Sequence, residues 1–203
     1  AKLAATRGYG AEVVLYDRVN EDRDEIGARL SAERGLTLIK PFDEPLVIAG
    51  QGTTGLEISE QAEEEGVTSA EVLVPCGGGG LTSGIALALE ASAPGFRVRP
   101  CEPKDFDDTA RSLASGRIER NVAISGSICD AIVTPQPGNI TFPILKRLAG
   151  AGIVVTDEEA LRAMALAFVR LKIVVEPGGA VALAAALFHG EALESDTVVA
   201  VTS

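Results

Sequence analysis

The sequence has no tryptophan and only two tyrosines and six phenylalanines among its 203 residues. Little aromatic surface is therefore left for stacking the bases of a nucleic acid. Basic residues are also few, because 18 Lys and Arg stand against 29 Asp and Glu, which gives a formal net charge of −11. Such a surface repels phosphate backbones and anionic lipid, so neither a nucleic acid nor a membrane is an expected partner.

Long apolar runs are absent as well. The longest clean run covers nine residues, 180–188, far fewer than a membrane span needs. Apolar residues nevertheless make up 46% of the chain, well above the range of disordered proteins. The sequence therefore predicts a soluble globular protein with a buried core, built as one large domain or one and a half small ones.

Cysteine and histidine are scarce. Cys76, Cys101 and Cys129 are an odd number without a CxxC pair, which favours reduced thiols in the cytoplasm over a disulfide framework or a zinc site. His189 is the only histidine. It follows an alanine-rich helical stretch and precedes Gly190, so we expect a helix C-terminal residue that faces solvent and takes no part in catalysis.

Apolar β-branched runs alternate with helical patterns, which is typical of an α/β protein whose parallel sheet carries helices on both faces. The expected strands are 12–16, 36–40, 71–75, 97–101, 152–155 and 197–202. The segment Pro-Phe-Asp-Glu-Pro at 41–45 is typical of a linker. It predicts a smaller lobe over residues 1–46 and a larger domain over 47–203.

The clearest helix signal begins at Thr156, where Thr-Asp-Glu-Glu predicts a capping box with Glu159. Apolar residues then follow at helical spacing, namely Leu161, Met164, Ala165, Phe168 and Leu171. This pattern predicts one apolar helix face packed in the core.

Both ends of the chain look interrupted. Residues 1–6 already have a helical pattern, and Ser203 directly follows an expected strand. In α/β proteins the ligand-contacting loops follow the carboxyl ends of strands. We therefore expect these residues to be a piece of a longer polypeptide.

The sharpest local signal is a buried strand from Glu71 that leads into four glycines and then an apolar helix. The glycines are Gly77, Gly78, Gly79 and Gly80. Residues without a Cβ let successive N–H groups point toward one ligand, and the helix dipole adds its positive end there. The pattern predicts a phosphate cradle, because a merely flexible loop would cost folding entropy without return.

The kind of phosphate is a separate question. A Walker A loop needs Gly-Lys-Ser/Thr, and no lysine follows these glycines, so nucleotide hydrolysis is disfavoured. The G-x-G-x-x-G register of dinucleotide folds fails at Thr82 or Ser83. Glu102 nevertheless lies about 20 residues on, where a ribose-binding acid would sit. A mononucleotide-like phosphate ester fits better, and NAD stays open as the alternative.

The loop Pro75-Cys-Gly-Gly-Gly-Gly-Leu-Thr-Ser-Gly84 resembles the phosphate loop of the fold-type II pyridoxal-phosphate enzymes, in the branch of threonine and serine dehydratases (ammonia-lyases) and serine racemases. Other segments agree with that family in order and spacing, namely Gln51-Gly-Thr-Thr-Gly, Cys101-Glu-Pro, Ser127-Ile-Cys-Asp-Ala, Val175-Glu-Pro-Gly-Gly-Ala and Val201-Thr-Ser203. The resemblance covers essentially the whole chain. It implies a tryptophan-synthase-β-like fold, with the large cofactor-binding domain at 47–203 and the remainder of a small domain at 1–46.

Residue by residue, the resemblance implies a site for pyridoxal 5'-phosphate. Gly77, Gly78, Gly79 and Gly80 would hold its phosphate. Ser203 would meet the pyridine nitrogen, and Glu176 would lie near the ring edge. A neutral hydroxyl at the nitrogen suits β-elimination, because it does not supply the charge that a carboxylate would.

The resemblance also implies a divalent cation. Glu102, Asp108 and the backbone carbonyl of Phe106 match the cation site of several family members, and an all-oxygen set suits Mg²⁺, Ca²⁺ or Mn²⁺. Without the resemblance, these acidic residues would be ordinary enrichment at a helix N-terminus.

The sequence departs from the family's pattern in two places. Ala131 stands where glycine is usual, which affects how closely the backbone approaches the cofactor ring. The Schiff-base lysine and the substrate-binding Ser-x-Gly-Asn-His segment have no counterpart, and none of the lysines stands in a matching context: Lys2, Lys40, Lys104, Lys146 and Lys172. We expect that lysine upstream and no catalytic residue in this chain.

The resemblance implies a pyridoxal-phosphate-dependent lyase that converts a β-hydroxy amino acid, L-threonine or L-serine, to a 2-oxo acid and ammonia. It further implies a small amino-acid substrate, a homodimer and a cytoplasmic enzyme of amino-acid metabolism. One alternative is a serine or hydroxyaspartate racemase or dehydratase of the same family. Another, if the 203 residues are the whole protein, is a non-catalytic fragment that binds phosphate ligands.

Overall fold

The computed structural model describes residues 2–17 and 20–203 and divides the chain into two compact units, Ala1–Leu38 and Ile39–Ser203. The described residues of the first unit form the helices α1 (Lys2–Gly8) and α2 (Arg23–Arg34). Asp22 caps α2 by accepting hydrogen bonds from two backbone N–H groups of its first turn, and Gly35 ends the helix in the left-handed conformation.

Two of the expected strands are wrong. Residues 12–16 and 36–40 lie in irregular backbone, and within the described ranges no strand pairs with them. Most of their side chains are exposed. Apolar composition makes a strand only where a neighbouring strand can accept its backbone hydrogen bonds, and none does so here. The division of the chain falls after Leu38, so the expected assignment of 1–46 to a small domain stays a prediction.

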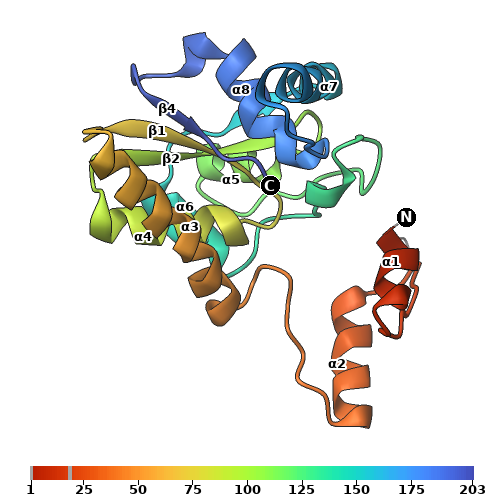
Figure 1. Ribbon diagram of the computed structural model, residues 1–203. Helices are drawn as coiled ribbons and strands as arrows, with labels where there is room; N and C mark the ends of the chain where they lie inside the picture. The colour runs from red at the N-terminus through yellow and green to blue at the C-terminus, as the bar shows by residue number, and fades with distance from the viewer. Residues whose placement is uncertain (1, 18–19) are drawn as a thin grey trace. The chain divides into compact units, whose positions relative to one another are not determined.

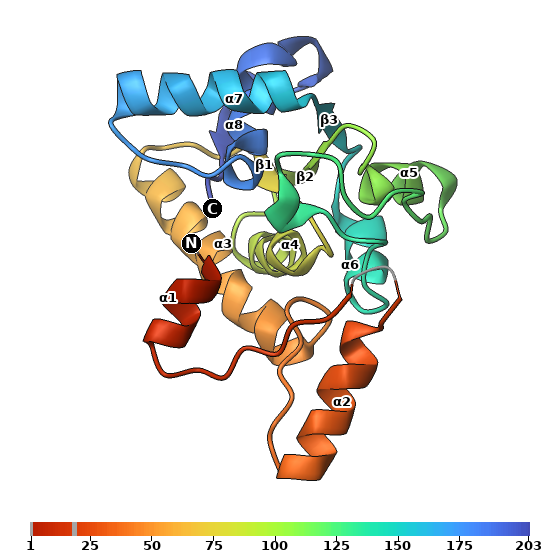
Figure 2. The same ribbon diagram turned by 90° about the vertical axis from the view of Figure 1, so that its right-hand side faces the viewer.

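The second unit is a parallel sheet between two layers of helices, which confirms the α/β prediction (Figures 1 and 2). Its strands are β1 (Ala70–Pro75), β2 (Phe96–Pro103), β3 (Ile153–Val155) and β4 (Val198–Ala200), in the order β3-β2-β1-β4. Its helices are α3 (Pro45–Glu64), α4 (Gly80–Ser92), α5 (Asp108–Ser115), α6 (Thr141–Leu148), α7 (Asp157–Leu166) and α8 (Val181–Phe188). Short helical segments are η1 (Asp130–Ile132), the π-helical η2 (Ala167–Leu171), η3 (Gly178–Ala180) and η4 (Gly190–Ala192). None of the described helices is both long and apolar enough to cross a membrane.

Strand β1 is buried along its whole length because both of its faces are covered. Val72 and Val74 pack with Ile85 and Leu89 of α4 on one face. Leu73 packs on the other face with the alanines of α8. Side chains alternate between the faces of a strand, so a continuous apolar run serves both helical layers.

The capping box of α7 is confirmed, because Thr156 and Glu159 make both reciprocal hydrogen bonds. The apolar face expected to follow it is wrong. Leu161, Phe168 and Leu171 are 52%, 63% and 58% exposed, whereas the buried positions of α7 and η2 are alanines, Ala160, Ala163 and Ala167. Because α8 is itself rich in alanine, the two helices pack mainly through their small side chains. Of the large residues of the predicted face, only Met164 packs partly buried against this cluster.

His189 lies at the C-terminus of α8 as expected, but it does not simply face solvent. Its side chain is 24% exposed, and Nε2 lies 3.2 Å from a carboxylate oxygen of Glu159, the capping residue of α7. Nδ1 lies 3.8 Å from Glu191. The histidine therefore joins the two helices of this layer.

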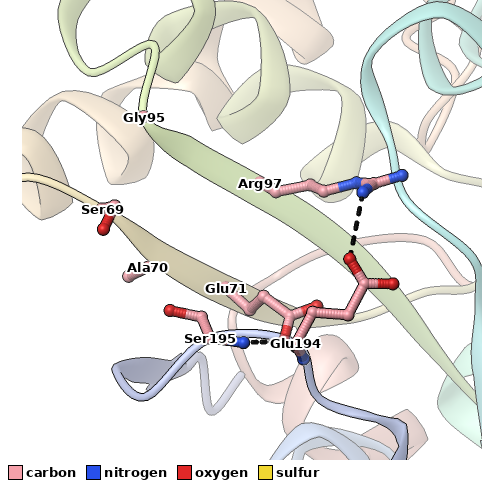
Figure 3. A pocket seen from close by; sticks show the side chains of 7 residues that line it. All are labelled: Ser69, Ala70, Glu71, Gly95, Arg97, Glu194 and Ser195. Atoms are coloured by element: carbon pink, nitrogen blue, oxygen red, sulfur yellow. Dashed lines mark hydrogen bonds and ion pairs between the residues drawn. The ribbon is translucent and has the colours of Figure 1, made fainter.

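The amino ends of the strands are held by a buried ion pair between Glu71 of β1 and Arg99 of β2. The other oxygen of Glu71 accepts hydrogen bonds from the N–H groups of Glu194 (2.7 Å) and Ser195 (3.2 Å). A cavity of about 280 Å³ lies at this edge and is lined by Ser69, Ala70, Glu71, Gly95, Arg97, Glu194 and Ser195 (Figure 3). Both oxygens of the buried Glu71 carboxylate already bind protein donors, so this carboxylate stabilises the fold and is not a ligand-binding group of the cavity.

Candidate cofactor site

The glycine loop joins the carboxyl end of β1 to α4, at the opposite edge of the sheet from that cavity. Gly79 is the N-cap residue of α4 and has a φ of +91°, a conformation that side chains rarely adopt. A Cβ on Gly77 would lie 3.0 Å from the carbonyl oxygen of Ile132. A Cβ on Gly78 would lie 2.3 Å from the ring of Phe42. The loop is therefore a packed, defined structure.

The loop keeps several backbone donors uncommitted. Gly78, Gly79 and Gly80 are buried, and in the part of the chain that the structure describes no group accepts a hydrogen bond from their N–H groups. The first turn of a helix has no carbonyl to offer these donors, and no side chain caps α4. An anion at the positive end of the helix dipole would satisfy them. The predicted cradle therefore has the donor set that a phosphate needs.

The structure brings the other sequence motifs to the same edge. Ile132, from the segment after Ser127, lies against Gly77 on one side and against Gly178 on the other. Gly179 lies against the backbone of Ser203, where a Cβ would overlap the carbonyl oxygen. These contacts form a continuous path from the glycine loop to the last residue of the chain.

The remaining candidate residues on this edge take different positions. Ala131 lies beside Gly178, with its Cβ 3.6 Å from the place where a Cβ would stand there. Glu176 is exposed in the segment before η3. The glycines of the Gln51 segment do not reach the loop; instead they let α3 approach α4, because Cβ atoms on Gly52 and Gly55 would meet the α4 backbone at 3.2 and 2.8 Å.

The segment Phe42-Asp43 also belongs to the site, and the sequence analysis assigned it only to a linker. Phe42 covers one side of the loop at Gly78 and Gly80. Asp43 accepts hydrogen bonds from the N–H groups that precede and begin α6. No spacing or motif signals these contacts, because Phe42 lies more than 30 residues before the loop and the Asp43 hydrogen bonds join segments almost 100 residues apart.

Two acidic side chains, Glu102 and Asp108, are buried beside the site. Glu102 accepts hydrogen bonds from the N–H groups of Thr109 (2.9 Å) and Ala110 (2.7 Å) at the start of α5. Asp108 accepts one from Asn121 (2.6 Å) through Oδ1, while its buried Oδ2 has no partner among the described residues. Burial raises the pKa of Asp108 to about 7, and burial together with the charge of Asp108 raises the pKa of Glu102 well above its usual value.

This arrangement bears on two sequence predictions. Glu102 is 0% exposed, and both of its oxygens accept hydrogen bonds from α5, so a group as large as a ribose does not reach this carboxylate. This removes the main support for NAD. For the predicted cation, the structure supplies two carboxylates and the segment of Phe106. Among the described residues no three His, Cys, Asp or Glu side chains gather as a metal site.

The cysteines are not nucleophiles. Burial raises the pKa of the Cys76 thiol, directly before the glycine loop, to about 12, and that of Cys129 to about 11. Burial also raises the pKa of Cys101. Thiolates are the reactive form, so these three side chains are inert packing groups at neutral pH.

The family described as "Pyridoxal-phosphate dependent enzyme" matches residues 1–203. The chain belongs to the pyridoxal-phosphate-dependent enzymes. It is 41% identical over 192 residues to an L-threo-3-hydroxyaspartate ammonia-lyase of Saccharomyces cerevisiae, covering 95% of this chain and 57% of the relative. It is 39% identical to a serine racemase of Schizosaccharomyces pombe, covering 98% of this chain and 60% of that protein.

A solved structure of a threonine deaminase is similar to this chain in fold as well as in sequence. A threonine deaminase from T.th. superposes with a TM-score of 0.90 at 46% identity, covering 98% of this chain and 64% of that one. The chain thus spans about three fifths of the length of the relatives it matches. The relatives confirm the family and its fold, and they differ from one another in substrate.

Proposed function

We propose that the protein containing this chain is a pyridoxal-phosphate-dependent ammonia-lyase for a β-hydroxy amino acid, with L-threonine or L-serine as the substrate. The observation that carries the proposal is the glycine loop, whose buried N–H groups of Gly78, Gly79 and Gly80 have no acceptor among the described residues. A phosphate fits these donors, and the family membership identifies pyridoxal phosphate as the compound that carries it.

The residues of this chain would hold and tune the cofactor. When bound, pyridoxal phosphate supplies the electron sink that weakens the bonds at the α-carbon of an amino acid. Gly77–Gly80 would anchor the phosphate, Ser203 would face the ring nitrogen with a neutral hydroxyl, and Glu176 would lie near the ring edge. Elimination of a β-hydroxyl group needs less electron withdrawal than a nitrogen paired with a carboxylate provides, which supports lyase chemistry.

A substrate panel tests this proposal. The full-length protein with pyridoxal phosphate is incubated with L-threonine, L-serine or L-threo-3-hydroxyaspartate, and ammonia and the 2-oxo acid are measured. We expect the highest kcat/KM with L-threonine or L-serine. Preference for hydroxyaspartate, or formation of D-serine without ammonia, would support the functions of the other two relatives, which are similarly close. No turnover of any substrate would contradict the proposal.

We also propose that Glu102, Asp108 and the carbonyl of Phe106 bind a divalent cation, Mg²⁺, Ca²⁺ or Mn²⁺. The support is the buried Oδ2 of Asp108, which has no partner among the described residues, beside a second buried carboxylate. Two buried acids of one sign are expensive unless a cation or protons neutralise them.

Thermal unfolding in the presence of each cation tests the site. Mg²⁺, Ca²⁺ or Mn²⁺ should raise the melting temperature of the full-length protein, and Asp108→Asn should abolish the rise. Asp107→Asn is the matched control, because Asp107 is the neighbouring acid but pairs with Arg111 at 3.3 Å. If a cation raises the melting temperatures of the wild type, Asp108→Asn and Asp107→Asn equally, it does not bind at this site. The homodimer and the cytoplasmic location remain predictions.

A further inference from the structure

The turn before α6 is built around a side chain from another part of the chain. Helix α6 has Ile140 at its N-cap position and therefore lacks a capping side chain of its own. Asp43 supplies one: Oδ2 accepts a hydrogen bond from the N–H of Asn139 at 3.0 Å, and Oδ1 accepts from Ile140 at 2.7 Å and Thr141 at 3.3 Å. A negative charge that receives three donors at a helix N-terminus is in its most favourable place.

The same turn is shaped to admit this carboxylate. A Cβ on Gly138 would lie 2.2 Å from Oδ1 of Asp43, so any larger residue there would displace this carboxylate. The N–H of Gly138 lies 3.0 Å from Oγ1 of Thr141 and 3.2 Å from the carbonyl oxygen of Gly78. The turn that Asp43 organises therefore reaches the glycine loop directly.

Thr141 makes the second connection to the loop. Its side chain is fully buried, and its hydroxyl donates a 2.6 Å hydrogen bond to the carbonyl of Gly78. A trans peptide unit is planar, with its C=O and N–H pointing in opposite directions. Fixing the Gly78 carbonyl toward α6 therefore directs the N–H of Gly79 to the other side of the loop. That N–H is one of the uncommitted donors of the cradle.

We propose that Asp43 is a positioning residue for the phosphate: it holds the turn before α6, and Thr141 passes this constraint to the peptide unit between Gly78 and Gly79. This inference rests on the proposed function, because it assumes that the glycine loop binds the cofactor phosphate. Four successive glycines have little conformational preference of their own, so their donors stay aligned only if neighbouring groups fix the loop. Asp43 acts from outside the loop, through the backbone at the start of α6.

The test compares two ligands in the full-length protein: pyridoxal 5'-phosphate and pyridoxal, which lacks the phosphate. Dissociation constants are measured by absorbance titration for the wild type and for Asp43→Ala, Asp43→Asn and Thr141→Val. Thr156→Ala is the matched control, because it removes an equally well-formed cap, that of α7, whose side-chain hydrogen bonds among the described residues join Thr156 to Glu159 and not to the glycine loop. Melting temperatures are recorded for all of them.

Asp43→Ala and Thr141→Val should each weaken binding of pyridoxal 5'-phosphate by roughly tenfold, the effect of losing one helix cap or buried hydrogen bond, with little change for pyridoxal. The double variant should lose no more than the larger single loss, because both residues act through the same peptide unit. Asp43→Asn, which keeps one acceptor oxygen, should fall between. Thr156→Ala should lower the melting temperature and leave both dissociation constants unchanged.

The outcomes separate the two proposals. If the wild type binds pyridoxal as tightly as pyridoxal 5'-phosphate, the loop is not a phosphate site and the proposed function fails together with this inference. If the wild type prefers the phosphorylated ligand but Asp43→Ala and Thr141→Val keep that preference, only the inference is wrong. It is also wrong if Thr156→Ala loses as much affinity, because general destabilisation would then account for the effect.

Discussion

The four glycines of the loop are required for different physical reasons. Gly79 has a left-handed backbone, whereas Gly77 is restricted by the carbonyl of Ile132. Gly78 and Gly80 leave room for Phe42, which approaches within 2.3 and 2.9 Å of the places where their Cβ atoms would stand. Sequence alone therefore singles out the glycine loop as the candidate cradle, but it does not show that a phenylalanine ring fills the other side of the loop.

Gly78→Ala tests this contact. The new Cβ would displace the Phe42 ring, so the free energy of unfolding should fall by about 1–3 kcal/mol, as for other overpacked sites. Phe42→Ala in the same chain should remove part of that loss, which a double-mutant cycle in urea measures. Gly190→Ala, where no atom lies within 4 Å of the added Cβ, should change stability by less than about 0.5 kcal/mol. If the losses in the free energy of unfolding caused by Gly78→Ala and Phe42→Ala simply add in the double variant, the two residues are not in contact.

The buried carboxylate of Glu71 predicts a pH dependence of stability. Burial raises its pKa, but hydrogen bonds from Glu194, Arg99 and Ser195 outweigh burial and hold the pKa below the ordinary value of 4.5. Its stabilising effect is therefore complete above about pH 4.5 and disappears as the pH falls through the lowered pKa.

Glu71→Gln should lower the free energy of unfolding by about 2–4 kcal/mol at pH 7, because Arg99 loses its buried partner. The difference in the free energy of unfolding between Glu71→Gln and the wild type should become smaller below about pH 4.5. Glu90→Gln, in an exposed pair with Arg147, should change the free energy of unfolding far less, because solvent screens that pair. If this difference in the free energy of unfolding stays constant down to about pH 3, the charged carboxylate of Glu71 is not the source of the stabilisation.

At the scale of elements, the packing of α3 on α4 depends on small residues. Ile48, Gly52 and Gly55 are the buried residues of α3, and the two glycines lie against the backbone of α4. Gly50 lies on the same helix with no atom within 4 Å of an added Cβ. One helix therefore offers the same substitution in two environments.

Gly55→Ala should destabilise the protein by about 1–3 kcal/mol, because its Cβ would lie 2.8 Å from both Ala88 and the carbonyl of Ile85. Gly50→Ala should instead stabilise it by about 0.5–1 kcal/mol, since alanine favours the helix. Denaturant unfolding of both variants measures the two effects. The same sign for both would show that the interface between α3 and α4 is looser than described.

Predictions from the sequence succeeded where local pattern and tertiary environment agree. The four strands of the sheet and the capping box at Thr156 are carried by local residues. The pattern failed for residues 12–16 and 36–40, where no described neighbour completes a strand. It also failed on α7, because alanines and not the larger apolar residues face α8. Periodicity identifies an apolar face, but it does not show which small residues permit a closer approach.

At the scale of the whole molecule, parallel topology explains why distant motifs meet. The carboxyl ends of parallel strands share one edge, so the glycine loop after β1 and Ser203 after β4 lie on the same side of the sheet. The turns at Ile132 and Gly178 fill the space between them. A sequence shows these motifs in order. Their convergence follows only when the strand order is known, whereas the contribution of Asp43 required the side-chain contacts.

The central claim is that this edge of the sheet binds pyridoxal phosphate in an enzyme whose cofactor lysine is none of those in this chain. The most direct measurement is the mass of the full-length protein after incubation with one equivalent of pyridoxal phosphate and borohydride reduction, followed by peptide mapping. We predict one reduced cofactor per polypeptide, attached to a single lysine other than Lys2, Lys40, Lys104, Lys146 and Lys172. No specific adduct, or an adduct on one of those five lysines, would contradict the account.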